Sequence, residues 1–267
     1  MNQPCLIIFD IDETLYSNHK REIPASTLFA IKRLKKAGHT LAIATGRAPF
    51  EFLEEIKNLD FDFHILANGQ IVKKGDEIIY ENAIDKKIVV ELMDVARKKG
   101  VHLGFNSKTH SSVTGLTDDM RKAFETYYAN MPEITDCIEA HSSIYQMWYL
   151  SEDIDEIKEQ FIDKLQFFPW LNNGADIVPH GSSKATGLTA ALELLKGSIP
   201  KKIIFFGDGL NDYDLIKMAD IGVAMGNASP ILKEIADLTT LDIVNDGIYH
   251  ACEFLNLFEE VSLTESN

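Results

Sequence analysis

Short apolar runs alternate with helix-length amphipathic segments at both ends of this chain, and this alternation constrains its fold more than any other feature. Apolar runs that are too short for helices are typical of strands buried on both faces, and the segments between them show helical spacing. The expected strands are residues 5–10, 40–45, 64–68, 202–208 and 221–225, and the expected helices are residues 24–38, 49–58, 184–195 and 211–219. This pattern predicts an α/β protein with a doubly wound parallel sheet.

The middle of the chain has a different pattern, in which helical stretches are mixed with short strand-like pieces. Helices are expected at 86–99 and 153–165, and strands around Leu103, at 144–150 and at 175–179. We interpret this part as a separate α+β unit, inserted between two halves of the parallel sheet. Two domains are therefore expected, a core from residues 1–81 and 182–267, and an insert from residues 82–181.

The charge balance limits the kind of partner. The 267 residues include 41 acidic and 26 basic side chains, a formal net charge of −15. A basic stripe for nucleic acid is absent, so an anionic ligand must be bound by a few local charges or by a metal ion. No apolar run approaches the length of about 18 residues typical of a membrane span. We therefore expect a cytoplasmic location, with neither a membrane nor a nucleic-acid partner.

The three cysteines, Cys5, Cys137 and Cys252, are few and widely spaced. An odd number at such spacing fits neither a disulfide framework nor a paired zinc site. Each is expected to be a buried thiol.

Acidic and hydroxyl side chains stand where the apolar runs end. The first run ends at Asp10 and Asp12, the second at Thr45, and a late run at Asp208, with Asp212 following. The carboxyl ends of parallel strands meet at one edge of a sheet, which is where ligands bind in such folds. These oxygen atoms would together suit a hard cation such as Mg²⁺.

Four motifs occur in a fixed order along the chain: "DIDETL" from Asp10, "TGR" from Thr45, "GSSK" ending at Lys184 and "GDGLND" from Gly207. In these motifs, and in "ANGQIV" around Asn68, the chain resembles the haloacid dehalogenase-like (HAD) phosphatase superfamily, specifically its Cof-type branch with a class IIB cap. The resemblance implies a Rossmann-like core and a mobile cap, and we use the word cap below for residues 82–181.

The resemblance also implies a role for each matching residue. Asp10 would be the nucleophile and a ligand of Mg²⁺, and Asp12 the general acid and base, with its backbone carbonyl on the metal. Asp208 would be a further metal ligand. The phosphate group would be bound by Thr45, Gly46, Lys184 and Asn211, with support from Asp212, Asn68 and Arg47.

The chemistry of phosphate monoesters agrees with these roles. Their hydrolysis is very slow without a catalyst, and its transition state spreads negative charge over the phosphoryl oxygens. A metal ion and Lys184 would neutralise this charge. A carboxylate nucleophile divides the displacement into two steps, and a second carboxyl can donate a proton and then accept one. On an extended strand end, Asp10 and Asp12 point to the same side.

Some residues allow a second interpretation. Thr45 could instead cap a helix beginning near Pro49, and Arg47 could form a surface ion pair as readily as a ligand contact. The aromatic residues Phe167, Phe168 and Trp170 are more typical of core packing in the cap than of a platform for a sugar.

Glu13 departs from the family pattern, because a glycine commonly follows the second acid of the first motif. Glycine there serves the backbone and not the chemistry. The substitution leaves the expected mechanism intact, but it argues against a strained turn at this position.

We therefore expect a magnesium-dependent phosphomonoester hydrolase that acts on small phosphorylated metabolites, especially sugar phosphates, through an aspartyl-phosphate intermediate. A monomer or weak homodimer is expected. Two alternatives remain open: a phosphosugar mutase with the same nucleophile, and a non-catalytic regulator that binds a phosphorylated metabolite. The sequence does not identify the physiological substrate.

Overall fold

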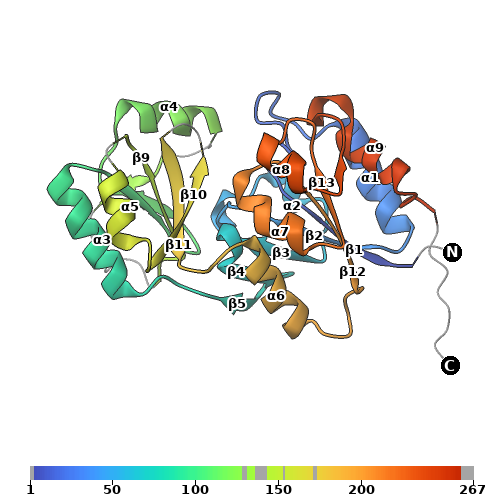
Figure 1. Ribbon diagram of the computed structural model, residues 1–267, viewed down its shortest axis with the longest axis horizontal. Helices are drawn as coiled ribbons and strands as arrows, with labels where there is room; N and C mark the ends of the chain where they lie inside the picture. The colour runs from blue at the N-terminus through green and yellow to red at the C-terminus, as the bar shows by residue number, and fades with distance from the viewer. Residues whose placement is uncertain (1–2, 128–130, 136–142, 153, 171–172, 260–267) are drawn as a thin grey trace.

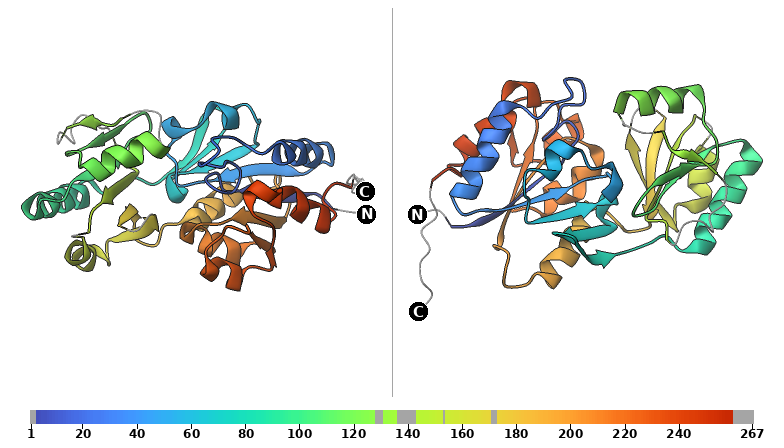
Figure 2. Two further views of the ribbon diagram at one scale, coloured as in Figure 1. Left: turned by 90° about the horizontal axis from the view of Figure 1, so that it is seen from above. Right: turned by 180° about the vertical axis from the view of Figure 1, so that it is seen from behind.

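The computed structural model describes residues 3–127, 131–135, 143–152, 154–170 and 173–259, and contains two sheets in separate halves of the molecule (Figures 1 and 2). The larger sheet has eight strands in the order β14-β13-β12-β1-β2-β3-β4-β5. Six of them, from β14 to β3, run parallel. At the edge of the sheet, β4 pairs antiparallel with β3, and β5 pairs antiparallel with β4. The predicted α/β class and doubly wound parallel sheet are confirmed.

The strands of the large sheet are β1 (Cys5–Phe9), β2 (Thr40–Ala44), β3 (Phe63–Leu66), β4 (Ile71–Lys74), β5 (Glu77–Glu81), β12 (Lys202–Gly207), β13 (Ile221–Ala224) and β14 (Leu238–Thr239). Every residue of β1 is buried, as expected for a central strand covered on both faces. The helices of this half are α1 (Ala25–Lys36), α2 (Glu54–Lys57), α6 (Lys184–Leu194), α7 (Tyr213–Met218), α8 (Pro230–Ile235) and α9 (Gly247–Phe254). Helix α1 lies against α9, and α6 lies against α7 (Figure 1).

Two predicted helices are shorter than expected. Residues 49–58 form a 3-10 turn, η1 (Pro49–Glu51), and the single helical turn α2, because Phe52 and Leu53 between them are extended and pack against the core. The predicted helix 153–165 is reduced to α5 (Asp155–Phe161), and Leu165 already begins a strand. In both places, burial of apolar side chains overrides the local helical pattern.

The smaller sheet belongs to the cap and has six strands in the order β10-β11-β9-β6-β7-β8. They are β6 (Leu103–Asn106), β7 (Ser111–Val113), β8 (Glu133–Ile134), β9 (Gln146–Leu150), β10 (Leu165–Trp170) and β11 (Gly174–Pro179), accompanied by helices α3 (Lys86–Lys99), α4 (Asp118–Tyr127) and α5. The predicted α+β character of this segment agrees with these elements.

The two faces of the cap sheet differ because side chains alternate along a strand. In β9, Met147 and Tyr149 pack with α3 and α5, whereas Trp148 and Leu150 pack with α4. Phe167 of β10 belongs to the first of these faces, as predicted for core packing. Phe168 is also buried and Trp170 packs against the cluster on the second face, so core packing is confirmed for them too, although both also line a cavity.

The chain crosses between the two halves twice, after β5 and before α6. At these crossings, the Asn82 amide donates hydrogen bonds to Gln70 Oε1 (2.9 Å) and to Ser182 Oγ (3.2 Å). On this topology we propose the domain division at residues 82 and 181. Of the helices that the structure describes, none combines the length and apolar character needed to cross a membrane. Cys5 and Cys252 are buried free thiols, and Cys137 lies outside the described residues.

Candidate active site

The predicted site residues gather at the carboxyl edge of the large sheet. Asp10 follows β1, Thr45 follows β2, and Asp208 follows β12, three strands that lie side by side. Lys184 reaches them from the first turn of α6, where the backbone amide of Ser183 donates to Thr186 Oγ1 and so helps to fix the helix start. Segments that lie far apart in the sequence thus contribute to one place.

Lys184 is completely buried and holds two acids together. Its Nζ donates to Asp10 Oδ1 (2.8 Å) and to Asp212 Oδ1 (2.6 Å). The other oxygen of Asp212 accepts hydrogen bonds from the backbone amides of Asp208 and Gly209, both at 3.0 Å. Burial lowers the pKa of Lys184, but the two carboxylates outweigh it, so the pKa lies above its ordinary value and Lys184 keeps its charge.

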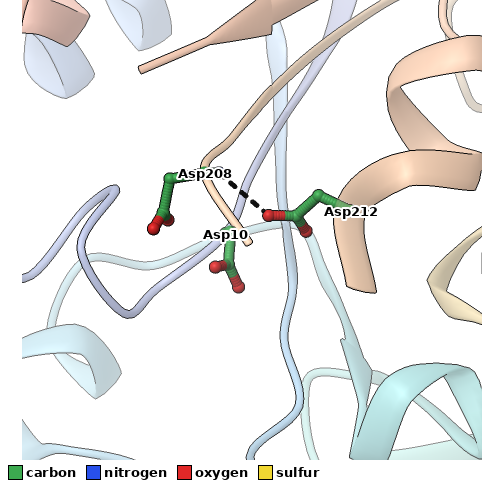
Figure 3. Close-up of side chains that lie close together, drawn as sticks. All are labelled: Asp10, Asp208 and Asp212. Carbon is green, nitrogen blue, oxygen red and sulfur yellow. Dashed lines mark hydrogen bonds between the residues drawn. The ribbon is translucent and has the colours of Figure 1, made fainter. Parts of the chain in front are cut away.

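Three acids form a cluster that can hold a divalent cation. Oxygens of Asp10, Asp208 and Asp212 all lie within 4.8 Å of one another (Figure 3). Burial raises the pKa of Asp10 to about 7; Asp212 adds to this rise and Lys184 opposes it. Burial and the neighbouring acids also raise the pKa of Asp208 well above its ordinary value. A cation would replace this repulsion by attraction, and the all-oxygen donor set suits a hard ion.

Arg47 and Asp12 form an ion pair with two hydrogen bonds. Arg47 Nε donates to Asp12 Oδ2 (2.8 Å), and the terminal Nη2 donates to Asp12 Oδ1 (2.6 Å). The alternative of an ion pair is thus confirmed for Arg47, but its side chain is only 6% exposed, so the expected position at the surface is wrong. Burial raises the pKa of Asp12, but the charge of Arg47 outweighs it and holds the pKa below its ordinary value. Asp12 is therefore a carboxylate at neutral pH.

Thr45 is buried, and its hydroxyl accepts a hydrogen bond from the backbone amide of Arg47 at 3.1 Å. The residue that caps the turn at Pro49 is Ala48, so the alternative in which Thr45 caps a helix there is wrong. Gly46 lies under the cap. A Cβ atom at Gly46 would stand 3.2 Å from Asp176 Oδ2, a tight contact that a larger side chain would worsen.

Asn68 connects the core to the cap. Its amide nitrogen donates to Asp176 Oδ2 of β11 (2.8 Å), and its Oδ1 accepts from Asn211 Nδ2 (2.9 Å). Asn68 lies in a short turn, η2 (Ala67–Gly69), in which all three residues have positive φ, 50°, 52° and 94°. Such strain is typical of functional loops that their surroundings hold in place.

A cavity of about 530 Å³ opens above the acid cluster, between core and cap. Its core wall includes Asp10, Asp12, Gly46, Arg47, Asp208 and Asn211, and its cap wall includes Asn106, Phe124, Gln146, Trp148, Trp170 and Asp176. Of these cap residues, the sequence singled out Trp170 alone, and there core packing was favoured over contact with a sugar. The alternation along "YQMWYL" places Gln146 and Trp148 on one face, and this signal could have identified them.

The chain matches the family described as haloacid dehalogenase-like hydrolase over residues 7–252. The chain belongs to this family. It is 32% identical to the "Putative phosphatase YkrA" of Bacillus subtilis, over 95% of this chain and 98% of that protein. It is also 32% identical, over 96% of its length, to a "Putative bifunctional phosphatase/peptidyl-prolyl cis-trans isomerase" of Streptococcus pyogenes, but it spans 54% of that longer protein.

A solved HAD subclass IIB sugar phosphatase has 30% sequence identity and a TM-score of 0.86, covering 95% of this chain and 99% of the other. The resemblance inferred from the four motifs is thus confirmed, and the Rossmann-like fold with it. The chain is a HAD-like phosphatase, an enzyme that acts on phosphorylated substrates.

The first motif of this HAD-like chain contains a left-handed turn at Glu13. Glu13 has φ of 57°, the left-handed conformation that glycine adopts freely. Its Oε1 accepts from the backbone amide of Asn18 (2.9 Å), and its carbonyl oxygen accepts from Asn227 Nδ2 (2.8 Å). The expectation that the substitution argues against a strained turn is therefore wrong, and these bonds offset a strain of about 1 kcal/mol.

Proposed function

We propose that this HAD-like phosphatase is a magnesium-dependent phosphomonoester hydrolase that acts on small phosphorylated metabolites through an aspartyl phosphate on Asp10. The observation that carries the proposal is the position of Asp10. It is bonded to the buried ammonium of Lys184, lies within 4.8 Å of Asp208, and faces the cavity beside Asp12. A nucleophile, positive charge and a second carboxyl are what stepwise phosphoryl transfer requires.

Asp10, Asp208 and the backbone carbonyl of Asp12 would hold Mg²⁺, which would supply charge neutralisation at the phosphoryl group. In the first step, Asp10 attacks phosphorus, the bond to the ester oxygen breaks, and Asp12 protonates the departing alcohol. In the second step, water attacks the phosphorus of the aspartyl phosphate and gives a proton to Asp12. The bond between phosphorus and the Asp10 oxygen breaks, which releases phosphate and restores the Asp10 carboxylate. Lys184 and Thr45 bind the phosphoryl oxygens in both steps.

The pairing of Asp12 with Arg47 suits the second step better than the first. A carboxylate that is held ionised by a guanidinium is ready to accept a proton. Donation to the leaving group needs a protonated Asp12, so we expect substrate binding to weaken this ion pair.

Sugar phosphates are the substrate class that we favour. The similarity to a solved HAD subclass IIB sugar phosphatase supports this choice. The polar side chains Asn106, Gln146 and Asp176 in the cap wall support it too, because they can form hydrogen bonds with sugar hydroxyls.

The test is a phosphate-release screen over phosphorylated metabolites with Mg²⁺, with excess chelator and with Ca²⁺. We expect turnover with Mg²⁺ only, because the looser coordination of Ca²⁺ misplaces Asp10. Acid-quenched enzyme should carry a phosphoryl group on Asp10, and Asp10→Asn should abolish both turnover and labelling. An isomerised sugar phosphate instead of free phosphate would indicate a mutase. Ligand binding without turnover would indicate a regulator, and full activity of Asp10→Asn would contradict the mechanism.

A further inference from the structure

The cavity wall that would surround the leaving group is short of positive charge. Among the cavity-lining residues that the structure describes, the basic side chain is Arg47, which donates two hydrogen bonds to the carboxylate of Asp12. Acidic residues of the same wall include Glu51 and Asp176. The segments outside the described residues contain no lysine or arginine in the sequence. A second anionic group on a substrate would therefore meet acids without a matching cation.

Asp176 is the acid that the cap contributes to this wall. Its Oδ1 accepts from Trp170 Nε1 (2.9 Å), its Oδ2 accepts from Asn68 Nδ2 (2.8 Å), and Gln146 is a further hydrogen-bond partner. Burial raises the pKa of Asp176 to about 7 and these three hydrogen bonds oppose that rise, so Asp176 carries its charge above this pH. All three partners are uncharged, so they stabilise the carboxylate without cancelling its charge. A carboxylate has about four acceptor positions, so one remains for a donor on the substrate.

The neighbouring cap residues also offer acceptors. Asn106 is 3% exposed, and its Oδ1 is one of the buried oxygens without a hydrogen-bond partner in the part of the chain that the structure describes. Its Nδ2 faces Gln146 Oε1 at 3.5 Å. A buried acceptor without a partner costs free energy, and a hydroxyl or amino group of a ligand would remove that cost.

We propose that Asp176 is a specificity-determining residue, which makes the enzyme discriminate against phosphate esters whose leaving group carries a second negative charge and favour leaving groups with hydroxyl or amino donors. This inference rests on the proposed hydrolase function. Asp176 acts on the leaving group and takes no part in the transfer of the phosphoryl group.

Matched substrates test this proposal. Sorbitol 6-phosphate and 6-phosphogluconate differ only in a hydroxymethyl group against a carboxylate, and glucosamine 6-phosphate differs from glucose 6-phosphate by a cationic amino group. The wild-type enzyme should have a higher kcat/KM for sorbitol 6-phosphate than for 6-phosphogluconate, and for glucosamine 6-phosphate than for glucose 6-phosphate. For any compound that is not turned over, its competitive inhibition constant against 4-nitrophenyl phosphate replaces kcat/KM.

Asp176→Asn should raise the ratio of kcat/KM for 6-phosphogluconate to kcat/KM for sorbitol 6-phosphate about tenfold, because it removes the repulsion between the Asp176 carboxylate and that of the substrate. Asn106→Asp, which adds a carboxylate to the same wall, should lower that ratio by a similar factor and keeps the test valid if Asp176→Asn does not fold. Asp163→Asn is the matched control, since Asp163 is an exposed cap carboxylate. It makes the same change in net charge and should leave the ratio unchanged.

Two kinds of failure can be told apart. A wild-type enzyme that releases phosphate from no ester would contradict the proposed function itself. An active enzyme that prefers 6-phosphogluconate would overturn the role of Asp176 alone. The role of Asp176 would also be overturned if the ratio of kcat/KM for 6-phosphogluconate to that for sorbitol 6-phosphate stays within twofold of the wild-type ratio in both Asp176→Asn and Asn106→Asp.

Discussion

At the scale of single residues, Asp208 illustrates a conflict between metal binding and stability. It lies with Asp10 and Asp212 in a buried cluster of like charges, and its Oδ1 accepts from Thr14 Oγ1 at 2.7 Å. Asp208→Asn removes one charge and keeps an oxygen for that bond. In excess chelator we expect a gain of about 1 kcal/mol in the free energy of unfolding, or ~3 °C in melting temperature.

The same variant should lose the rise in melting temperature that Mg²⁺ gives the wild type, and at least ~100-fold of its phosphate release. Asp214→Asn is the control, because Asp214 is an exposed acid on the neighbouring helix. It should behave like the wild type in calorimetry and in turnover. A chelator-treated Asp208→Asn that is less stable than the wild type would show that the cluster is not strained by repulsion.

Asp12 gives a second prediction at this scale, which concerns the leaving group. Asp12→Asn cannot donate a proton, so turnover of alkyl phosphates such as glucose 6-phosphate should fall by about 1,000-fold. Turnover of 4-nitrophenyl phosphate should fall by only ~10-fold, because its leaving group needs little protonation. Asp12→Asn also removes the charged partner of Arg47, so melting curves are needed to check that the variant remains folded. Equal losses for both substrates would argue against Asp12 as the acid.

At the scale of elements, the turn η2 is packed tightly against the start of α6. A Cβ atom at Gly69 (φ 94°) would lie 2.0 Å from the carbonyl oxygen of Ser183, the residue before Lys184. Gly69→Ala should therefore cost about 3 kcal/mol in urea denaturation and reduce turnover as well. Gly75→Ala is the matched control, because Gly75 also has positive φ (56°) but open space around its Cα. It should cost about 1 kcal/mol and leave turnover unchanged. Similar costs for the two variants would contradict the packing argument.

Strand β3 carries a pH-sensitive side chain, His64. Its Nδ1 is buried and has no hydrogen-bond partner among the residues that the structure describes. Burial, aided by Lys73, lowers its pKa to about 4. Because the folded state binds this proton less readily than the unfolded chain, whose histidine pKa is near 6.5, stability is full above pH 6.5 and falls as the pH drops towards 4.

The contribution of His64 amounts to about 2 kcal/mol between pH 8 and pH 5. His64→Gln removes this titration, so the free energy of unfolding of the variant should fall less steeply over that range. Urea denaturation at several pH values gives the slope of the free energy of unfolding against pH for each protein. Acids that both proteins share contribute equally to the two slopes, so their contribution cancels in the difference. Parallel slopes would mean that the pKa of His64 is not lowered in the folded protein.

At the scale of the whole molecule, the two chain crossings are connected by Asn82, through its hydrogen bonds to Gln70 and Ser182. Asn82→Ala should loosen the position of the cap relative to the core. We expect a several-fold higher KM for sugar phosphates and faster hydrogen exchange near both crossings, with a smaller effect on 4-nitrophenyl phosphate, which needs less of the cap. Asn58→Ala, at an exposed position of the core, is the control. Unchanged exchange at the crossings would show that these bonds do not hold the cap.

The sequence by itself determined the large sheet and the centre of the site. Asp10, Thr45 and Asp208 could be predicted to meet because each follows a buried strand, and the carboxyl ends of parallel strands share an edge. The order of four motifs added Lys184 and the family. These inferences succeed because they depend on local patterns and on a topology with few alternatives.

Only the tertiary structure decided how the cap completes the site. The meeting of Asn68 and Asp176, 108 residues apart, depends on how two domains pack, and no local pattern encodes it. The same holds for the bidentate pair of Arg47 and Asp12 and for the left-handed turn at Glu13. Local propensity contributes a few tenths of a kcal/mol per residue, whereas burial and hydrogen bonds between distant segments contribute about 1 kcal/mol each, so tertiary contacts override local preference where the two conflict.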